Sequence, residues 1–373
     1  MSQVNNLIKV LHSKNYSDNI IAWEVIDPIE ADFQKFPREL NPILVEGLLS
    51  LGIKELYRHQ LEAFYSILNG ENVVISTGTA SGKTFAYNLP VFNTMISIPE
   101  ITALYIFPTK ALTADQLNKI HECDSAICRP ISKKAPRFIS PAIYDGDTSL
   151  NERNQIRGKA NIILTNPDML HLGILPHHTL WERFFHNLKY VVIDEIHIYR
   201  GVFGSHVANL IRRLKRICSF YNSKPQFIMT SATIANAAQF AQKLIEQPVT
   251  LIDQDGSAYG RRNILLYNPP IINRELGLRN SIISETVKVT DILFANEAQA
   301  IIFARSRKTV EMTLRTLQTV YEKNVDQMRG YRSGYLPTER RSIENGLRNG
   351  SIRTVVSTNA LELGIDMGGM DEI

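Results

Sequence analysis

The chain is 373 residues long, and its 44% hydrophobic and 21% charged residues exclude a disordered or fibrous protein. With 41 basic and 37 acidic residues it carries a net charge of +4, which permits a nucleic-acid partner without indicating one. Three cysteines, the lack of a secretory leader and the lack of an apolar run of about 18 residues argue against secreted and membrane-spanning proteins, so we expect a cytoplasmic protein.

Short apolar runs recur along the chain and alternate with amphipathic stretches. Nearly every residue in these runs is apolar, which is typical of parallel strands that are buried on both faces. The helical stretches between them indicate βαβ units, so we predict an α/β fold built on parallel sheets. The predicted strands are Val73–Ser76, Ala103–Phe107, Ile162–Thr165, Tyr190–Ile193, Gln226–Met229, Ala300–Ala304 and Arg353–Ser357.

A polar, glycine-bearing stretch at Asp253–Arg262 interrupts this pattern and is interpreted as a linker. We therefore expect an N-terminal extension over residues 1–35, with a short amphipathic helix. A first α/β domain is expected over residues 36–255 and a second over 256–373. The second domain stops soon after a strand and a glycine-bearing turn, so we expect its sheet to be incomplete.

The first predicted strand runs into a loop of small residues, and a helical stretch follows. Small residues let backbone N–H groups surround a phosphate chain, and the helix directs its positive end at the same anion. Lys83 is placed to reach the β and γ phosphates, and the Thr84 hydroxyl to bind Mg²⁺. A simple glycine turn before a helix is the alternative. The predicted phosphate-binding residues are Thr77, Gly78, Thr79, Ala80, Ser81, Gly82, Lys83 and Thr84.

The predicted strand Tyr190–Ile193 ends in Asp194 and Glu195, at the sheet edge where ligands bind in open α/β folds. We interpret Asp194 as a ligand of Mg²⁺ and Glu195 as the base that deprotonates the attacking water, and Lys83 completes the catalytic set. A strand that simply ends at the solvent-exposed surface could also be followed by an Asp-Glu pair. The spacing of about 110 residues from the phosphate loop, within one predicted sheet, favours catalysis. His197 is predicted to link the nucleotide to the next motif, with a core or surface histidine as the alternative.

The order of these motifs resembles the superfamily 2 DEAD/DEAH-box-like helicases. Asp194-Glu195-Ile196-His197 follows the phosphate loop, and Ser231-Ala232-Thr233 follows the next strand. The resemblance implies two RecA-like motor domains, the second incomplete, with ATP bound between them. Further segments resemble helicase motifs Q, Ia, Ib, IV and V, and these are Tyr57–Gln60, Phe107–Leu112, Thr165–Leu170, Ile301–Arg307 and Ser357–Asp366.

The resemblance also implies roles for single residues. Gln60 is expected to read the adenine, and Gly364 and Asp366 to close the ATP cleft from the second domain. Ser231 and Thr233, with His197, are expected to couple the nucleotide site to the nucleic acid. The expected nucleic-acid contacts, which bind phosphates without reading sequence, are Thr109, Lys110, Thr165, Asn166, Arg305, Arg307 and Thr358.

Longer strings, among them TGTASGKT and TNALELGIDMGG, resemble the YprA-like DNA helicases of the bacterial mitomycin-repair type. This resemblance implies a nucleic-acid-stimulated ATPase that uses ATP and Mg²⁺, moves 3′ to 5′ on single-stranded or tailed DNA, and serves DNA repair. It also implies an arginine-bearing motif VI, which this sequence does not reach. We therefore expect a chain truncated after motif V and impaired on its own. An RNA helicase, a duplex translocase and a truncated ATP- or DNA-binding fragment are the alternatives.

Overall fold

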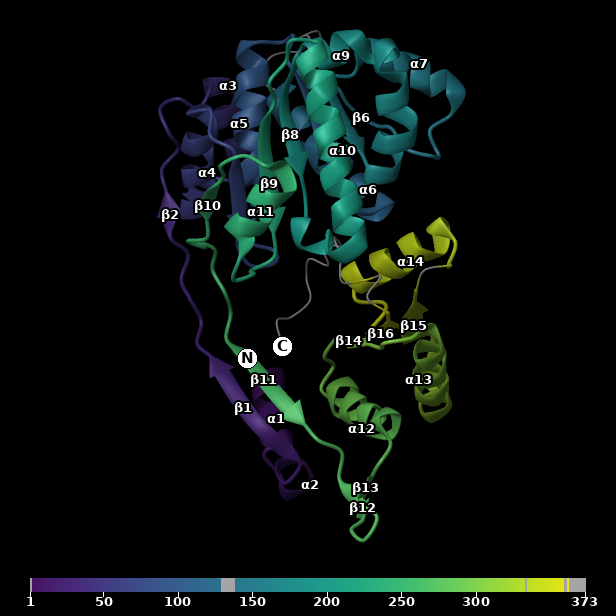
Figure 1. The fold of residues 1–373 in the computed structure, drawn as a ribbon. Coiled ribbons are helices and arrows are strands. Elements are labelled where there is room, and N and C mark those ends of the chain that lie inside the picture. The colour runs from purple at the N-terminus through teal and green to yellow at the C-terminus, as the bar shows by residue number, and fades with distance from the viewer. Residues whose placement is uncertain (1, 129–137, 333, 359–360, 362–373) are drawn as a thin grey trace. The chain divides into compact units, whose positions relative to one another are not determined.

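The computed structural model describes residues 2–128, 138–332, 334–358 and 361. The chain divides into two compact units. The first, which we call the central unit, comprises Glu30–Ala258. The second, the composite unit, joins Met1–Ile29 to Tyr259–Ile373, so the chain passes between the units twice. Figure 1 labels the elements of both units.

A parallel sheet forms the middle of the central unit, and its seven strands in the described residues run in the order β10-β4-β9-β8-β5-β7-β6. Parallel neighbours need crossover connections, and helices supply most of them. The predicted parallel α/β fold is confirmed. The strands are β4 (Val73–Ser76), β5 (Thr102–Ile106), β6 (Pro141–Ile143), β7 (Ile162–Thr165), β8 (Leu188–Ile193), β9 (Gln226–Ser231) and β10 (Thr250–Ile252).

Both faces of this sheet are buried, because successive residues of a strand point to opposite sides. Val73 and Ile75 belong to one apolar cluster and Val74 to the other. Helices cover the two faces, as Figure 1 shows. One face is covered by α3 (Pro42–Ser50), α4 (Arg58–Leu68), α5 (Lys83–Ser97) and α6 (Lys110–Cys128). The other is covered by α8 (Pro167–Met169), the helical turns Leu170–Ile174 and Leu175–Trp181, α9 (Glu182–His186), α10 (Gly201–Phe220) and α11 (Ala237–Ile245).

The central unit also contains a pair of short strands and the helix α7 (Leu150–Lys159). The short strands β2 (Phe33–Gln34) and β3 (Leu56–Tyr57) pair antiparallel, and α7 is capped by a Ser149–Glu152 capping box. Helix α10 buries its apolar side in the core. Two of its basic side chains contact the end of the neighbouring helix α11, where Arg212 pairs with Glu246 and the Lys215 ammonium donates to the Ile245 carbonyl. These two side chains therefore stabilise the packing of α10 against α11.

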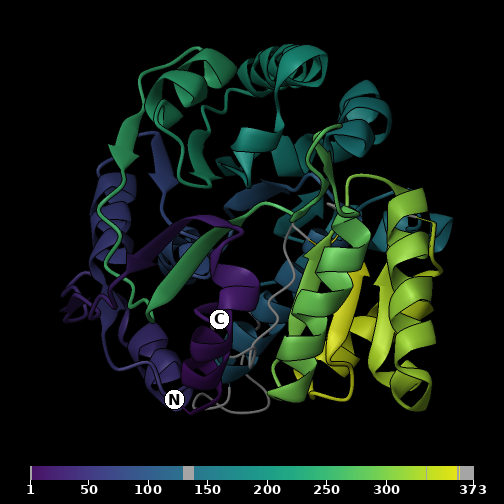
Figure 2. The same ribbon diagram turned by 90° about the horizontal axis from the view of Figure 1, so that it is seen from below.

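The N-terminal segment folds as part of the composite unit. Strand β1 (Ile20–Ile26) pairs antiparallel with β11 (Arg262–Tyr267), and the two lie side by side in Figures 1 and 2. Helices α1 (Ser2–Leu11) and α2 (Lys14–Ser17) precede this pair, and Leu7 of α1 is buried, so the predicted short N-terminal helix is confirmed.

A three-stranded parallel sheet, in the order β14-β16-β15, forms the core of the composite unit's described part. Residues of α12 and α13 pack in one apolar cluster and residues of α14 in another. No helix among the described residues is long and apolar enough to cross a membrane. The elements are the hairpin β12 (Ile271–Asn273) and β13 (Leu278–Arg279), α12 (Ile282–Ala295), β14 (Ala300–Phe303), α13 (Arg307–Val320), the turn Glu322–Gln327, β15 (Met328–Tyr331), α14 (Pro337–Arg348) and β16 (Thr354–Ser357).

Candidate nucleotide site

The loop between β4 and α5 has the backbone shape of an anion-binding turn. Gly82 caps α5 in the left-handed conformation (φ 83°, ψ 26°), and Ala80 shares that region (φ 60°). Left-handed residues within such a loop direct successive N–H groups toward one point. The N-terminus of α5 adds its partial positive charge at the same place. The loop therefore has the geometry that a phosphate chain requires.

Lys83 folds back over this loop. Its ammonium donates to the carbonyls of Thr77 and Gly78, each at 2.9 Å. The hydroxyls of Thr77 and Ser81 lie 2.7 Å apart across the loop, and both side chains are buried. Thr84 follows in the first turn of α5. The predicted phosphate-binding residues thus form one continuous turn with the lysine at its centre.

Gln60 lies against the same loop from the N-terminus of α4. Its side-chain oxygen accepts the Tyr57 N–H at 2.9 Å, and its nitrogen donates to the Gly82 carbonyl at 3.0 Å. A Cβ at Gly82 would lie 2.6 Å from that nitrogen, so glycine is required for this close approach as well as for its positive φ. The residue predicted to read adenine therefore also supports the end of the phosphate loop.

Asp194 follows β8 at the carboxyl edge of the sheet and is held by two donors. The Thr230 hydroxyl and the Glu195 N–H, the latter at 3.0 Å, both donate to Asp194 Oδ1. Burial raises the pKa of Asp194, and the charge of Glu195 raises it further, while the Thr230 bond and the charge of Lys83 lower it. A buried carboxylate of this kind is stabilised as an anion by a nearby cation. Its chemistry fits the predicted role as a ligand of Mg²⁺.

Glu195 adopts a backbone conformation that is unusual for a residue with a side chain (φ 53°, ψ 48°). Such left-handed residues cost about 1–3 kcal/mol and cluster at functional sites. Its N–H also lies 3.1 Å from the Thr230 hydroxyl oxygen, which helps to fix the turn. Burial raises the pKa of the Glu195 carboxyl and the charge of Lys83 lowers it.

His197 connects this carboxylate to the strand end after β9. Its Nδ1 accepts the Ala232 N–H at 3.1 Å and lies 3.2 Å from Glu195 Oε2. Nδ1 accepts the Ala232 N–H only when it carries no proton, whereas a hydrogen bond between Nδ1 and the Glu195 carboxylate requires a shared proton. The protonation of His197 and Glu195 therefore determines which of the two contacts forms. The Ser76 hydroxyl, just before the phosphate loop, donates to the Ala232 carbonyl at 3.2 Å. Ala232 is therefore held from both the phosphate loop and the acidic turn.

The two hydroxyl residues beside Ala232 differ in their surroundings. Ser231 is fully buried, and its hydroxyl has no hydrogen-bond partner among the residues the structure describes. Thr233 is exposed. Ser231 and Thr233, two of the predicted coupling residues, thus lie at and just beyond the end of β9, the first buried and the second exposed.

The predicted nucleic-acid contacts of the central unit fall into two kinds. Thr109 caps α6, and the Lys110 ammonium at the start of that helix pairs with Asp147 at 2.8 Å. Asn166 caps α8, where its side chain accepts the Met169 N–H. Thr165 is fully buried and its hydroxyl donates to the Tyr144 carbonyl, so its side chain lies within the sheet and not on a surface.

The remaining predicted residues belong to the composite unit. Arg305 and Arg307 are exposed just before and at the start of α13, and Thr358 is buried directly after β16. Gly364 and Asp366, predicted to close the ATP cleft, lie outside the described residues.

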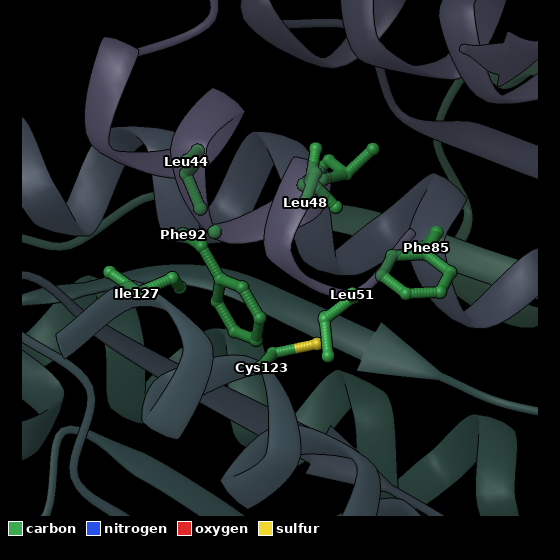
Figure 3. A pocket seen from close by; sticks show the side chains of 9 residues that line it. Leu44, Leu48, Leu51, Phe85, Phe92, Cys123 and Ile127 are labelled. Carbon is green, nitrogen blue, oxygen red and sulfur yellow. The ribbon is translucent and has the colours of Figure 1, made fainter. Parts of the chain in front are cut away.

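An apolar pocket lies between α3, α5 and α6 (Figure 3). Its lining includes Leu44, Leu48, Phe85, Phe92 and the Cys123 thiol. No charged side chain lines it, so it offers no charged group to bind a phosphate.

Comparison with known proteins places the nucleotide site in a family. The family description "DEAD/DEAH box helicase" matches residues 57–240, and "Helicase conserved C-terminal domain" matches residues 283–373. The chain belongs to the DEAD/DEAH-box helicases. The predicted membership of the DEAD/DEAH-box helicase family is thereby confirmed, including the resemblance to YprA.

Individual helicases of this family align with nearly the whole chain. ATP-dependent helicase YprA of Bacillus subtilis (strain 168) is 47% identical over 365 residues, which cover 97% of this chain and 48% of YprA. ATP-dependent helicase HRQ1 of Saccharomyces cerevisiae is 38% identical over 375 residues, covering 98% and 34%. The crystal structure of the DUF1998 helicase MrfA bound to DNA and AMPPNP matches with a TM-score of 0.91 at 46% identity, covering 98% and 50%. The chain therefore spans between a third and a half of these helicases.

Two residues of the site were not predicted from the sequence. Thr230 holds Asp194, and Asp255 accepts the Gly78 N–H at 2.9 Å. Thr230 could have been found as the last but one residue of an apolar strand that ends beside the acidic turn. Asp255 follows the three-residue strand β10, which is too short to show a pattern in the sequence.

Proposed function

We propose that this chain is the motor core of an ATP-dependent nucleic-acid helicase that acts on DNA. The observation that supports it best is the convergence of Lys83, Asp194 and Glu195. The charge of Lys83 lowers the pKa of both carboxyl groups, although the lysine follows β4 and the two carboxyl groups follow β8. A lysine inside a phosphate-binding loop, facing two buried carboxylates, is the arrangement needed to hydrolyse a nucleoside triphosphate.

Each residue of the site has a role in this proposal. The N–H groups of the loop and the Lys83 ammonium bind the β and γ phosphates. Thr84 and Asp194 would hold Mg²⁺, which neutralises phosphate charge when bound. Glu195 orients the attacking water and accepts its proton, a task suited to a carboxyl whose pKa burial has raised. Gln60 recognises the adenine beside Gly82.

Coupling to the nucleic acid is proposed to run through His197. It touches both the Glu195 carboxylate and the Ala232 N–H, so a change at the acidic turn reaches Ser231 and Thr233 directly. Gly364 and Asp366 are proposed to complete the ATP cleft, on the family resemblance alone.

DNA is the proposed track because relatives of high identity were crystallised with it. MrfA, at 46–47% identity, was solved bound to DNA. Lys110, Asn166, Arg305 and Arg307 are the proposed phosphate contacts of this chain, together with Thr109 and Thr358. The YprA-like resemblance further supports 3′ to 5′ movement on single-stranded or tailed DNA and a role in DNA repair.

Nucleotide binding is the first test of this function. A fluorescent ATP analogue should bind the purified protein in the presence of Mg²⁺, and Lys83→Ala should abolish that binding without lowering the melting temperature. Lys224→Ala, which removes a lysine from an exposed position, is the matched control. Equal affinity of the parent and Lys83→Ala would overturn the assignment of the site.

Strand displacement is the second test. Duplexes with a 3′ or a 5′ single-stranded tail, made of DNA or RNA, separate the possibilities. In a protein extended to the full length of its relatives, we expect ATP-dependent unwinding of DNA with a 3′ tail only. Unwinding of RNA duplexes, or movement along blunt DNA without strand separation, would replace the proposal by an RNA helicase or a duplex translocase.

A further inference from the structure

Asp255 bonds directly to the phosphate loop, although it lies in the stretch that the sequence predicts as a linker. It lies three residues after β10, in the segment that leads to the second passage between the units. Its Oδ2 accepts the Gly78 N–H at 2.9 Å, and its Oδ1 accepts the N–H and the hydroxyl of Ser257 at 3.0 and 2.7 Å. Only 16% of the side chain is exposed, so these bonds are shielded from water.

The Thr77–Gly78 peptide is held from both sides as a result. Its N–H, which belongs to Gly78, donates to Asp255, while its carbonyl, which belongs to Thr77, accepts the Lys83 ammonium at 2.9 Å. A shift of this peptide would displace both the lysine and the start of the loop. Hydrogen bonds to a carboxylate are stronger than those between neutral groups, so Asp255 is well suited to prevent that shift.

The next residue, Gly256, ties the same segment to the turn that carries Gln60. The Gly256 N–H donates to His59 Nδ1 at 3.4 Å, and its carbonyl accepts the Asp32 N–H at 2.9 Å. A Cβ at Gly256 would lie 2.8 Å from the Arg58 backbone nitrogen, so only glycine fits between these segments. Fully buried His59 also lies 3.7 Å from Asp255 Oδ1.

Two contacts therefore fasten the adenine-side turn to opposite ends of the loop. Gln60 bonds the Gly82 carbonyl at the end of the loop. The Asp255–Gly256 segment bonds Gly78 at its start and His59 beside Gln60. With both in place, the loop and the turn are fixed in one register.

We propose that Asp255 is a positioning residue for the nucleotide, which holds the phosphate loop through Gly78 and aligns it with the His59-Gln60 turn. This inference rests on the proposed ATP-binding function. Asp255 bonds the backbone of the phosphate loop and has no proposed contact with the attacking water. Its loss should therefore lower nucleotide affinity more than it lowers the rate of bond cleavage.

Electrostatics alone would give the opposite result. A carboxylate close to the phosphate site repels the anionic nucleotide, so removing its charge would tighten binding if geometry were unimportant. Asp255→Asn keeps the shape of the side chain but loses its charge and one of its two acceptor oxygens. The sign of the change in affinity thus decides between positioning and repulsion.

The experiment compares four proteins: the parent, Asp255→Asn, Ser257→Ala and the control Asp253→Asn. Asp253 is exposed, and its replacement by Asn removes the same charge two residues away from Asp255. Titration with a fluorescent ATP analogue and Mg²⁺ measures Kd, and steady-state ATPase assays with DNA, made on the same variants extended to the full length of the relatives, measure KM and kcat. We expect a Kd and KM about tenfold or more higher for Asp255→Asn, the range for a lost bond to a charged group, with kcat changed less than threefold. Ser257→Ala should change Kd in the same direction but less, and Asp253→Asn should match the parent.

The outcomes separate the two claims. A parent protein that does not bind the analogue overturns the proposed function and this inference with it. A parent that binds, with Asp255→Asn binding equally or more tightly, overturns only the positioning role. If Asp255→Asn melts well below the parent, Ser257→Ala decides, because it leaves the Gly78 bond in place and removes only one bond to the carboxylate. A Ser257→Ala protein with unchanged Kd then counts against the proposal.

Discussion

Glu195 combines a strained backbone, a raised side-chain pKa and a place beside the buried carboxylate of Asp194. In a protein extended to the full length of its relatives, we predict that Glu195→Gln binds the ATP analogue with the parent's affinity but hydrolyses ATP about 10²–10⁴-fold more slowly, the usual cost of losing a general base. Steady-state hydrolysis and analogue titration on one preparation provide the comparison.

Glu246 supplies a control for that experiment. It has nearly the same left-handed backbone (φ 53°, ψ 40°) at the end of α11, but it is paired with Arg212 on the surface. Glu246→Gln should leave hydrolysis unchanged. If Glu195→Gln also retains turnover within a few-fold of the parent, Glu195 is not the base.

The buried thiols give a prediction in which pH is the variable. Burial raises the pKa of Cys123 to about 12 and that of Cys218 to about 11. The thiolate is the reactive form, and at pH 8 it amounts to only ~10⁻⁴ of Cys123 and ~10⁻³ of Cys218. Iodoacetamide should therefore leave both unmodified in the folded protein, react about tenfold faster per pH unit up to pH 10, and label both in denaturant. Peptide mass spectrometry resolves the two sites, and rapid labelling of Cys123 at pH 8 would contradict the packing seen in Figure 3.

Among single residues, the sequence predicts those whose chemistry is recognisable from their immediate neighbours in the chain. Lys83, Asp194 and Glu195 are recognisable because small residues, strand ends and carboxylates follow one another directly. Asp255 is not, because its partner Gly78 is far away in the sequence and no local pattern marks the pair. Nor could the sequence tell that the last residue of β7, Thr165, points inward.

Among the elements, the start of α10 depends on one glycine. A Cβ at Gly204 would lie 2.1 Å from the carbonyl oxygen of Tyr199, which belongs to the turn after the acidic residues. We predict that Gly204→Ala lowers the melting temperature, because overlap with a backbone atom outweighs the ~0.5–1 kcal/mol that alanine gains over glycine in a helix. Thermal unfolding followed by circular dichroism measures this.

Gly158 in α7 makes the matched control. It is also helical, but a Cβ there meets nothing within 4 Å. Gly158→Ala should leave stability unchanged or raise it slightly. Equal melting temperatures for the two variants would show that α10 can move away from the Tyr199 turn at little cost.

The sequence predicts seven of the parallel strands because an apolar run buried on both faces is easy to recognise. It misses β6, β10 and β15, which are three or four residues long. β15 also contains Arg329 and Gly330, so its composition does not indicate a strand. These strands form because neighbouring strands offer them a hydrogen-bonding edge, a tertiary effect that a local stretch of sequence does not contain.

For the whole molecule, the proposed DNA contacts predict a salt dependence. Lys110, Arg305 and Arg307 are the three cationic side chains among them, and each neutralised phosphate on a single strand adds about −0.7 to the slope of log K against log salt. We expect a slope near −2 with little dependence on base sequence, measured by fluorescence anisotropy on several oligonucleotides. Lys110→Ala should make the slope shallower by about 0.7, whereas Lys224→Ala should not. A flat salt response, or strong preference for one sequence, would argue against phosphate binding.

The pairing of β1 with β11 is the feature of the whole molecule that the sequence conceals most. The partners Ile26 and Arg262 are separated in the sequence by the entire central unit. Apolar side chains such as Ile21 and Leu266 remain exposed, so neither strand shows a clear inside and outside in its sequence.

That pairing has a consequence for how the protein is made. A ribosome releases residues 1–29 first, yet the strand that completes β1 emerges only after more than 200 further residues, roughly 10–50 s later at ordinary elongation rates. The central unit, in contrast, is one uninterrupted stretch and can fold as it appears. During translation, the apolar strand β1 must therefore remain unpaired until β11 has been synthesised. Premature pairing of β1 with another edge is the hazard that this order of synthesis creates.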